Sequence, residues 1–433
     1  MTLETGESSG APIINKESSF VQELQKHGFS MKEVKKPNQR YNAMVYQHEP
    51  SLTNEQQKRS NLLLLPGISG EPGGTTHVSV TFLAEIDNVD TAVGVNSSVS
   101  TSALEASKYD ADLDKQTSDL VALYKESVGE DKEKPLIIVG HSLGGGNGAL
   151  VAQRLLEEGY NVEQLFLFAP TGLVDRKTGS FLYDGLRMNK LSHYTQDIPI
   201  LYPSPVDLAE FQKLEEELSN KPHLNLQEQE AREVYRLALE RATNPDKLLL
   251  VNLGVEKKAA VEKIDAEMTD LIAQEDNSLM KKIRLQLLQK KRIFLLRKAV
   301  MDAVFGKINN DLSQAPMDIK QMRRMAGNLM HSPKSLLTTA GEMGKDITVA
   351  TIDQLISFNN GLVTQEGDPH PLNITIVSGK KDPVPGDYER GEPNAVQVGP
   401  KITLAELSVP HMDHFTIASD PKRVAHMINR RAA

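Results

Sequence analysis

The sequence predicts an α/β protein in which a mostly parallel sheet, flanked by helices, is interrupted by a large helical insertion. Short apolar runs alternate with helical segments before residue 172 and again after residue 371. This alternation is typical of right-handed βαβ units and a parallel sheet. Between these two parts, strand-like runs nearly vanish and long charged helical patterns take over. The two alternating parts together contain about 235 residues, which is the size of a single α/β domain.

The first part of the chain begins with a polar segment, residues 1–40, within which residues 6–10 indicate a loose tail. The residues 62–65 are four consecutive leucines, and Pro66 and Gly67 end the run. A short apolar run bounded by turn residues favours a strand covered on both faces. The other elements expected here are a strand at 41–48, a glycine-rich loop at 67–74, a helix at 75–86, a strand at 93–95 and a helix at 102–127.

The insertion and the last part of the chain differ clearly in pattern. The helical patterns of the insertion lie at 208–218, 227–242, 261–274 and 281–298, and the later strands at 374–378 and 401–409. A last helix is expected to begin near Ser419, because Asp420 is a capping residue type and Pro421 suits the first helical position. We therefore divide the chain into a polar segment (1–40), a core (41–172 and 371–433) and a helical insertion (173–370).

The composition excludes several classes of protein. The chain has no Cys, which rules out disulfides, thiolate metal sites and a cysteine nucleophile. Its formal net charge of −9 disfavours a general nucleic-acid binder, and the absence of Trp disfavours stacking platforms. The first 20 residues resemble no signal peptide, and no run approaches the roughly 18 apolar residues of a membrane span. We expect a cytoplasmic protein, with export by a route without a cleaved signal left open.

The most informative stretch reads Gly140-His141-Ser142-Leu143-Gly144. A buried strand is expected before it, at 135–139, and a helix after it, at about 147–158, and then a strand at 162–169. The pattern is typical of a serine on a sharp strand-to-helix turn, where the glycines permit a strained backbone and close packing. The N–H of Leu143 and the helix dipole could stabilise a developing oxyanion. The alternatives are an incidental serine in a glycine-rich turn and, more weakly, a phosphate-binding loop, which would need Gly-Lys-Ser/Thr.

With these residues the sequence resembles the α/β-hydrolase superfamily, and in particular its lipase and esterase members. The resemblance covers the roughly 235 core residues and leaves the insertion unexplained. It implies a nucleophile elbow formed by Gly140, His141 and Gly144 around the nucleophile Ser142. It also implies a triad whose members follow in the order serine, acid, histidine.

The resemblance places the other two triad members after later strands. Asp382 follows the strand at 374–378, with a turn-forming Asp before proline as the alternative role and Asp387 as the rival acid. His414 precedes Phe415 and the last helix, as in the family, and is favoured over His411 as the base. His141 is disfavoured as the base, because its side chain and that of the adjacent Ser142 would diverge on a sharp turn.

The resemblance also implies a second oxyanion donor, the N–H of Ile68, in the loop after the leucine strand. Here the chain reads Pro66-Gly67 where many relatives have His-Gly, which leaves the identity of this donor open. Ser at 142, rather than Asp, disfavours epoxide and halide chemistry. We expect a serine hydrolase that cleaves a carboxylic ester of a small-molecule or lipid acyl substrate, without metal or cofactor. The alternatives are a thioesterase or acyltransferase with the same triad, and a non-catalytic interaction protein.

The insertion has two interpretations, a cap over the active site, which is favoured, and a separate interaction domain. Its segment 281–298 contains eight basic residues and no acidic one, and Arg284, Lys291 and Lys298 share a helical face. A basic amphipathic helix can contact a membrane surface. The favoured alternative is a bundle helix paired with acidic neighbours such as those at 262–276.

Overall fold

The computed structural model of the protein describes residues 19–35, 42–48, 59–67, 80–95, 113–129, 131–170, 196–243, 255–274, 278–311, 349–364, 366–379, 395–413 and 416–432. Within them, nine strands form one sheet in the order β1-β2-β4-β3-β5-β6-β7-β9-β8. The strands are β1 (Phe29–Lys35), β2 (Asn42–His48), β3 (Ser60–Leu65), β4 (Val89–Val95), β5 (Leu136–His141), β6 (Val162–Phe168), β7 (Leu372–Gly379), β8 (Val396–Gly399) and β9 (Ile402–Val409).

The sheet is parallel in its centre and antiparallel at its edges. The six strands β4, β3, β5, β6, β7 and β9 run parallel, whereas β1 and β2 at one edge and β8 at the other are antiparallel to their neighbours. The expected fold class, a mostly parallel sheet flanked by helices, is confirmed. The carboxyl ends of the six parallel strands consequently meet at one edge of the sheet, where ligands bind in open α/β folds.

The leucine run shows why the central strands are so apolar. Leu63 and Leu65 pack into the hydrophobic cluster on one face of the sheet, and Leu62 and Leu64 into the cluster on the other. Because successive side chains of a strand point to opposite faces, a strand covered on both sides must be apolar at every position.

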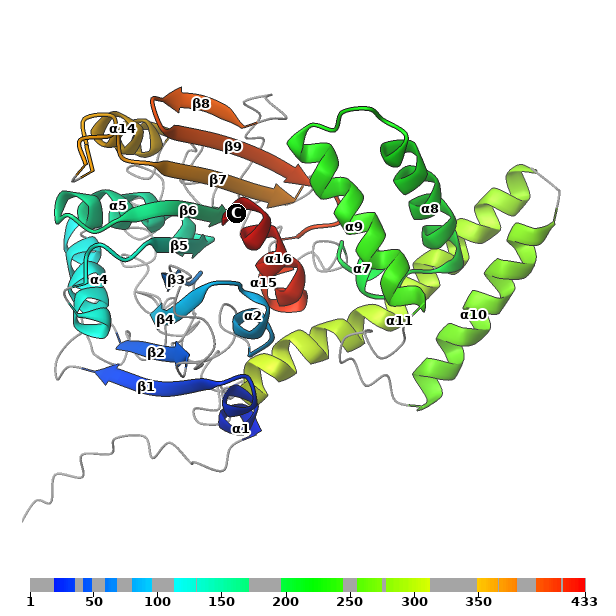
Figure 1. Cartoon of the computed structure of the whole chain (residues 1–433). Helices are drawn as coiled ribbons and strands as arrows, with labels where there is room; N and C mark the ends of the chain where they lie inside the picture. Colours follow the sequence, from blue (N-terminus) through cyan, green and yellow to red (C-terminus); the bar gives the residue numbers. More distant parts are fainter. Residues whose placement is uncertain are drawn as a thin grey trace, which may run out of the picture.

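Helices cover both faces of this sheet (Figure 1). The helices α4 (Leu113–Val128), α5 (Leu143–Glu157) and α14 (Val349–Asn359) pack on one face. The helices α1 (Ser19–Lys26), α2 (Val80–Glu85) and α16 (Pro421–Ala432) pack on the other. Although α14 lies within the predicted insertion 173–370, it packs against α5 as part of the sheet's own helical layer.

Some elements were not expected from the sequence. The polar segment 1–40 contains α1 and β1, and β1 extends the sheet by pairing with β2. One face of β1 is exposed and carries polar residues, so the sequence of this edge strand lacks the apolar run that predicts a buried strand. Two further short elements, β8 and α15 (Thr416–Ser419), were also missed.

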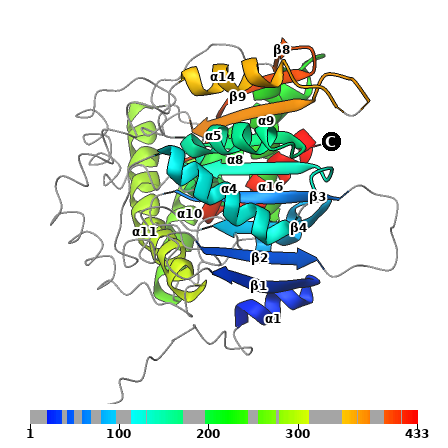
Figure 2. The ribbon, with the colours of Figure 1, turned by 90° about the vertical axis from the view of Figure 1, so that its left-hand side faces the viewer.

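The other helices of the insertion are α7 (Ile198–Leu201), α8 (Pro205–Ser219), α9 (Leu226–Thr243), α10 (Val255–Ala273) and α11 (Leu279–Asp311). In Figure 1 they lie beyond the sheet edge to which β7 and β9 point, and in Figure 2 α11 stands at the left of the sheet, where the arrow of β7 ends. We call α7 to α11 the cap. It contacts the core through α9 and β9 and through α11 and α15, and its role as a cap over the site stays a prediction.

Local sequence signals determine where two cap helices begin. Ser204 caps α8 by accepting a hydrogen bond from the N–H of Asp207, and the carboxylate of Asp207 accepts from the N–H of Ser204. Asn225 and Glu228 exchange the same pair of bonds at the start of α9. Each exchange satisfies backbone donors that have no partner within the helix.

The helices α10 and α11 form a hairpin with a small apolar core made by Ile264, Met268, Leu271 and Leu288. Arg292 of α11 is buried and donates hydrogen bonds to Asp265 of α10 and to the carbonyls of Tyr202 and Pro203. The more exposed Arg284 pairs with Glu267 at 2.6 Å. These pairs agree with the bundle interpretation for two of the basic residues in 281–298.

Buried charges join the cap to the core. Arg241 of α9 forms a two-pronged ion pair with Asp420, which immediately precedes α16, at 2.6 and 2.8 Å. Asp197, which precedes α7, accepts hydrogen bonds from the hydroxyls of Thr416 and Ser419 and lies 3.7 Å from Arg423. Paired charges of opposite sign can remain buried, whereas an unpaired one is strongly unfavourable.

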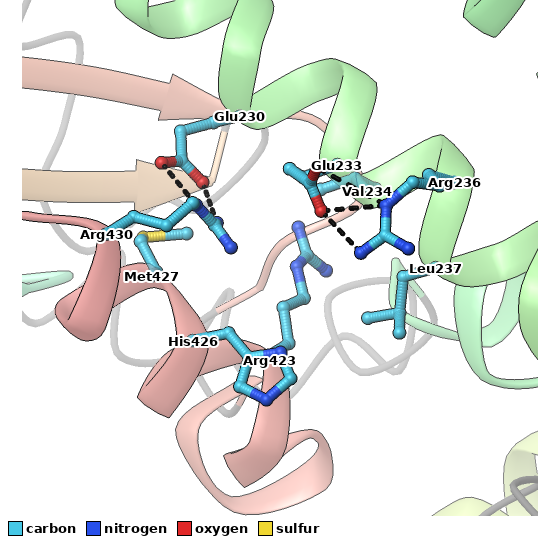
Figure 3. A pocket seen from close by; sticks show the side chains of 9 residues that line it. All are labelled: Glu230, Glu233, Val234, Arg236, Leu237, Arg423, His426, Met427 and Arg430. Atoms are coloured by element: carbon cyan, nitrogen blue, oxygen red, sulfur yellow. Dashed lines mark hydrogen bonds and ion pairs between the residues drawn. The ribbon is translucent and has the colours of Figure 1, made fainter. Parts of the chain in front are cut away.

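A third buried carboxylate extends this junction along α16 (Figure 3). Glu230 of α9 accepts hydrogen bonds from Arg430 at 2.5 Å and from Arg431 at 3.0 Å. Arg423 also reaches from α16 towards α9, beside a cavity of about 20 Å³, which has room for about one water molecule. The cap is therefore held to the last helix at several points.

None of the helices in the described part of the chain combines the length and the apolarity that crossing a bilayer requires.

The Arg241–Asp420 pair gives a first prediction about stability. Substituting Arg241→Ala should lower the free energy of unfolding by about 3–5 kcal/mol, because it leaves the buried carboxylate of Asp420 without its main partner. The matched control is Arg236→Ala on the same helix, whose ion pairs are half exposed. It should lower the free energy of unfolding by less than about 1 kcal/mol. Equal losses in urea denaturation would contradict a special role for the buried pair.

Asp197 gives a prediction about pH. Burial raises its pKa from 3.8 to about 6. The charge of Arg423 and the hydrogen bonds donated by Ser419 and Thr416 lower this pKa, but by less than burial raises it. Between these two values the folded state binds the proton more tightly than the unfolded chain, so this group's contribution to stability falls as pH rises. The melting temperature of the wild type minus that of Asp197→Asn should therefore decrease from about pH 4 to about pH 6 and then level off. A constant difference across this range would show that Asp197 stays ionised.

Candidate active site

Ser142 lies at the turn between β5 and α5, in a conformation that residues other than glycine rarely adopt. Its φ is 53° and its ψ is −117°. Such strain costs about 1–3 kcal/mol and persists only where the surrounding structure enforces it. Here the N–H of Ser142 donates to the carbonyl of Phe168 at 2.9 Å, and its own carbonyl accepts from the N–H of Gly146 at 3.1 Å. The serine predicted to be the nucleophile thus occupies a strained strand-to-helix turn.

The glycines around Ser142 are required by contacts between backbones. A Cβ at Gly144 would lie 2.2 Å from the carbonyl oxygen of Leu65, and one at Gly140 would lie 2.5 Å from that of Gly144. A Cβ at Gly145 would lie 2.8 Å from Pro170. The first turn of α5 is therefore pressed against the end of β3, and only glycine fits these positions.

The start of α5 is also an electrostatic feature of the site. Leu143 is the first residue of the helix, directly after Ser142. The first N–H groups of a helix have no acceptor within the helix, and the helix dipole makes this end positive. The predicted oxyanion donor, the N–H of Leu143, therefore lies where a negative charge next to Ser142 would be stabilised.

The end of β3 approaches the same serine from another side. A Cβ at Gly67 would lie 3.1 Å from the Cβ of Ser142 and 3.0 Å from Nδ1 of His141. The chain thus passes directly beside the serine just before the predicted second oxyanion donor, Ile68. Ile68 itself lies outside the described residues.

The segments that contain the other two predicted triad residues start from adjoining backbone positions. A Cβ at Gly379, the last residue of β7, would lie 1.9 Å from the carbonyl oxygen of Met412. Asp382 comes three residues after Gly379, and His414 comes two residues after Met412. Asp382, its rival Asp387 and His414 lie outside the described residues, so their side chains remain predictions.

The rival base His411 is described, and its ring packs against the cap. Its centroid lies 5.3 Å from that of Phe211 and 6.5 Å from that of Tyr235, both edge to face. The φ of His411 is 51°, and its carbonyl accepts a hydrogen bond from Arg423 at 2.8 Å. This packing suits a residue that joins the core to α8 and α9.

The remaining histidine of the motif, His141, is the last residue of β5 and is almost fully buried. It lies beside Gly67, beneath the turn. The assignment of His141 to the nucleophile elbow stays a prediction.

The structure adds residues that the sequence analysis missed. Thr416 accepts a hydrogen bond from the N–H of Asp413 at 2.8 Å and donates to Asp197 of the cap. Arg423 donates to the carbonyls of Pro410 and His411, on the other side of residue 414. The chain on both sides of His414 is thus fixed by buried polar groups. The only sequence signal near them, the Asp420-Pro421 pair, was interpreted as a helix start, and α16 does begin at Pro421.

Comparisons with known proteins assign neither a family nor a function to this chain. No model of a protein family matches the sequence, and no curated protein matches it. Among solved structures, a peroxisomal α/β-hydrolase of Saccharomyces cerevisiae is 10% identical, with 93% of this chain and 88% of that chain covered and a TM-score of 0.42. A bacterial membrane phospholipase A is 14% identical, with 94% and 87% covered and a TM-score of 0.37.

A third similar structure is a 2-hydroxy-6-oxo-6-phenylhexa-2,4-dienoate hydrolase from a Rhodococcus species. It is 11% identical, with 93% of this chain and 99% of that chain covered and a TM-score of 0.37. The strand order, the parallel centre of the sheet and the strained serine between β5 and α5 are the features that assign the fold here. The chain has the α/β-hydrolase fold.

Proposed function

We propose that this protein is a serine hydrolase that cleaves carboxylic esters through an acyl-enzyme intermediate. In this proposal Ser142 is the nucleophile, His414 the general base and Asp382 the acid that orients the histidine. The N–H groups of Leu143 and Ile68 form the oxyanion hole. The substrate is a small-molecule or lipid acyl ester, held between the carboxyl edge of the sheet and the cap.

The backbone conformation of Ser142 carries this proposal. A φ of 53° at a serine is energetically unfavourable, and three glycines are needed to permit the packing around it. An incidental serine in a turn would not need such an arrangement, since a glycine at position 142 would adopt the same φ without strain. In serine hydrolases of this fold, a strained strand-to-helix turn of this kind raises the nucleophilic hydroxyl above the sheet edge.

The proposed reaction follows from these positions. His414 accepts the hydroxyl proton of Ser142 while the serine oxygen attacks the ester carbonyl. The N–H groups of Leu143 and Ile68 stabilise the resulting oxyanion, and the protonated histidine donates its proton to the departing alcohol. Water, deprotonated by His414, then attacks the acyl-enzyme and releases the acid and Ser142.

The Ser142 hydroxyl should be essential for activity. We expect Ser142→Ala to abolish labelling by a fluorophosphonate probe and to lower kcat for a short activated ester by about 10⁴-fold or more, since the nucleophile is lost. Labelling and steady-state hydrolysis of the purified full chain test this directly.

Histidine variants serve as the internal comparison. His414→Ala should lower kcat about as much as Ser142→Ala, because residues of a triad act as a unit. His411→Ala should change kcat far less, since its ring packs against Phe211 and Tyr235. Undiminished hydrolysis in Ser142→Ala would mean that the activity belongs to another site, and a larger loss in His411→Ala would reassign the base.

Gly67 gives a separate prediction about positioning. A Cβ here would press on His141 and on Ser142 at 3.0–3.1 Å, so Gly67→Ala should displace the turn by a few tenths of an ångström. We expect kcat to fall by about 10-fold to 100-fold, because small misplacements of reacting groups are costly. The control is Gly361→Ala, whose Cβ would meet its nearest atom at an ordinary 3.5 Å. Equal kcat values for both variants would show that this loop does not position Ser142.

A further inference from the structure

The cap exposes an unusual concentration of apolar side chains. The described residues include eight exposed large hydrophobic side chains, of which six belong to the α10–α11 hairpin. Two of them, Leu279 and Met280, are each 72% exposed, Phe294 is 70% exposed and Leu287 is 61% exposed. The other two of the six are Ile272 and Ile283. A cluster of this kind differs from the scattered apolar residues of an ordinary surface and marks an interaction site.

These side chains form a continuous stripe along one face of α11. Met280, Ile283, Leu287 and Phe294 are separated by three, four and seven positions, which places them on the same side of a helix. The opposite side of α11 contains the buried Leu288, Arg292 and Leu296, which attach the helix to the rest of the cap. The stripe is therefore the outer face of a firmly anchored helix.

Basic residues border this stripe on both sides. By the same helical arithmetic, Lys290 lies along one border, and Lys291 and Arg284 lie along the other. Lys290 and Lys291 are exposed, and neither forms an ion pair with any other described residue. The first 19 residues of α11 include no Asp or Glu, although the whole chain has a net charge of −9. The stripe thus combines apolar and positive character on an otherwise acidic protein.

We propose that this face of α11 docks on the surface of an anionic phospholipid membrane. Leu287 and Phe294 would enter the boundary between headgroups and acyl chains, while Lys290 and Lys291 would contact lipid phosphates and carboxylates. An apolar stripe between basic borders is the arrangement that binds a helix parallel to an anionic bilayer. The aliphatic stems of the lysines allow their ammonium groups to remain at headgroup level.

Charge and shape favour a membrane over the other occupants of such a face. A symmetric contact with a second copy of this chain would bring the lysines of both copies together, and this like-charge contact is unfavourable. The stripe lies on the convex outside of a helix, so a protein partner would need a groove shaped to receive it. A fluid bilayer accommodates such a ridge and supplies the complementary negative charge.

The test is co-sedimentation of the full chain with vesicles, and it is independent of catalysis. We expect binding to vesicles of phosphatidylcholine mixed equally with phosphatidylserine, little binding to phosphatidylcholine alone, and weaker binding as NaCl rises from about 50 to about 500 mM. Lys290→Gln with Lys291→Gln should weaken binding about 30-fold, at about a factor of five for each charge. Leu287→Ser with Phe294→Ser should weaken it by roughly 100-fold.

Matched controls keep the test specific. Lys213→Gln with Lys401→Gln removes two other exposed lysines, and Val363→Ser removes an apolar side chain that is 65% exposed on the core. These variants should bind like the wild type. All variants should keep the wild-type melting temperature, because the substituted side chains are exposed.

Several results would overturn the proposal. These are no sedimentation of the wild type at low salt, equal binding to both kinds of vesicle, or equal losses in the stripe variants and the controls. Self-association in analytical ultracentrifugation that Leu287→Ser with Phe294→Ser abolishes, without vesicle binding, would assign the face to a second copy. Hydrolysis of a soluble ester reports on Ser142 separately, so a failure of the proposed activity would leave this result unaffected.

Discussion

The contact between the first turn of α5 and the end of β3 is the constraint on which the site depends. Because the carbonyl oxygen of Leu65 lies only 2.2 Å from the position of a Cβ at Gly144, the helix can begin only with glycine at this position. The short connection from β5 then leaves Ser142 no ordinary conformation, and its φ of 53° follows. The strain is held by the hydrogen bond to Phe168 and by the packed sheet beneath it. The strained conformation of Ser142 is thus a consequence of backbone packing.

The same sheet edge is also where the cap is attached. Asp197 holds Thr416 and Ser419 just after residue 414, and Arg423 holds the carbonyls just before it. These polar groups are buried, so each bond is stronger than it would be in water and each loss would be more costly. The described residues on both sides of position 414 are therefore held by the cap and by α16 together.

The cap itself has two chemically different sides. Its inner side satisfies its charges locally, as Arg292 does with Asp265 and with the carbonyls of Tyr202 and Pro203. Its outer side leaves Leu287 and Phe294 in solvent between exposed lysines. The inner face of α11 therefore fits the bundle interpretation of the basic segment 281–298, and the outer face carries the proposal of membrane docking. Sequence periodicity alone could not separate them, because apolar residues occur on both faces of α11.

Local signals in the sequence were sufficient for the central strands, the sharp turn at Ser142 and the four long cap helices, but not for the short helix α7. The leucine run predicted a doubly covered strand, and the glycines around Ser142 predicted the sharp turn, because both depend on neighbouring residues. The edge strand β1, the membership of α14 in the sheet layer and the buried network of Asp197, Arg241, Asp420 and Arg423 depended on the tertiary structure. These charges are separated by up to 226 positions in the chain, and a buried Arg or Asp looks in sequence like any exposed one. Only folding brings them together, and only burial gives their pairing its energetic weight.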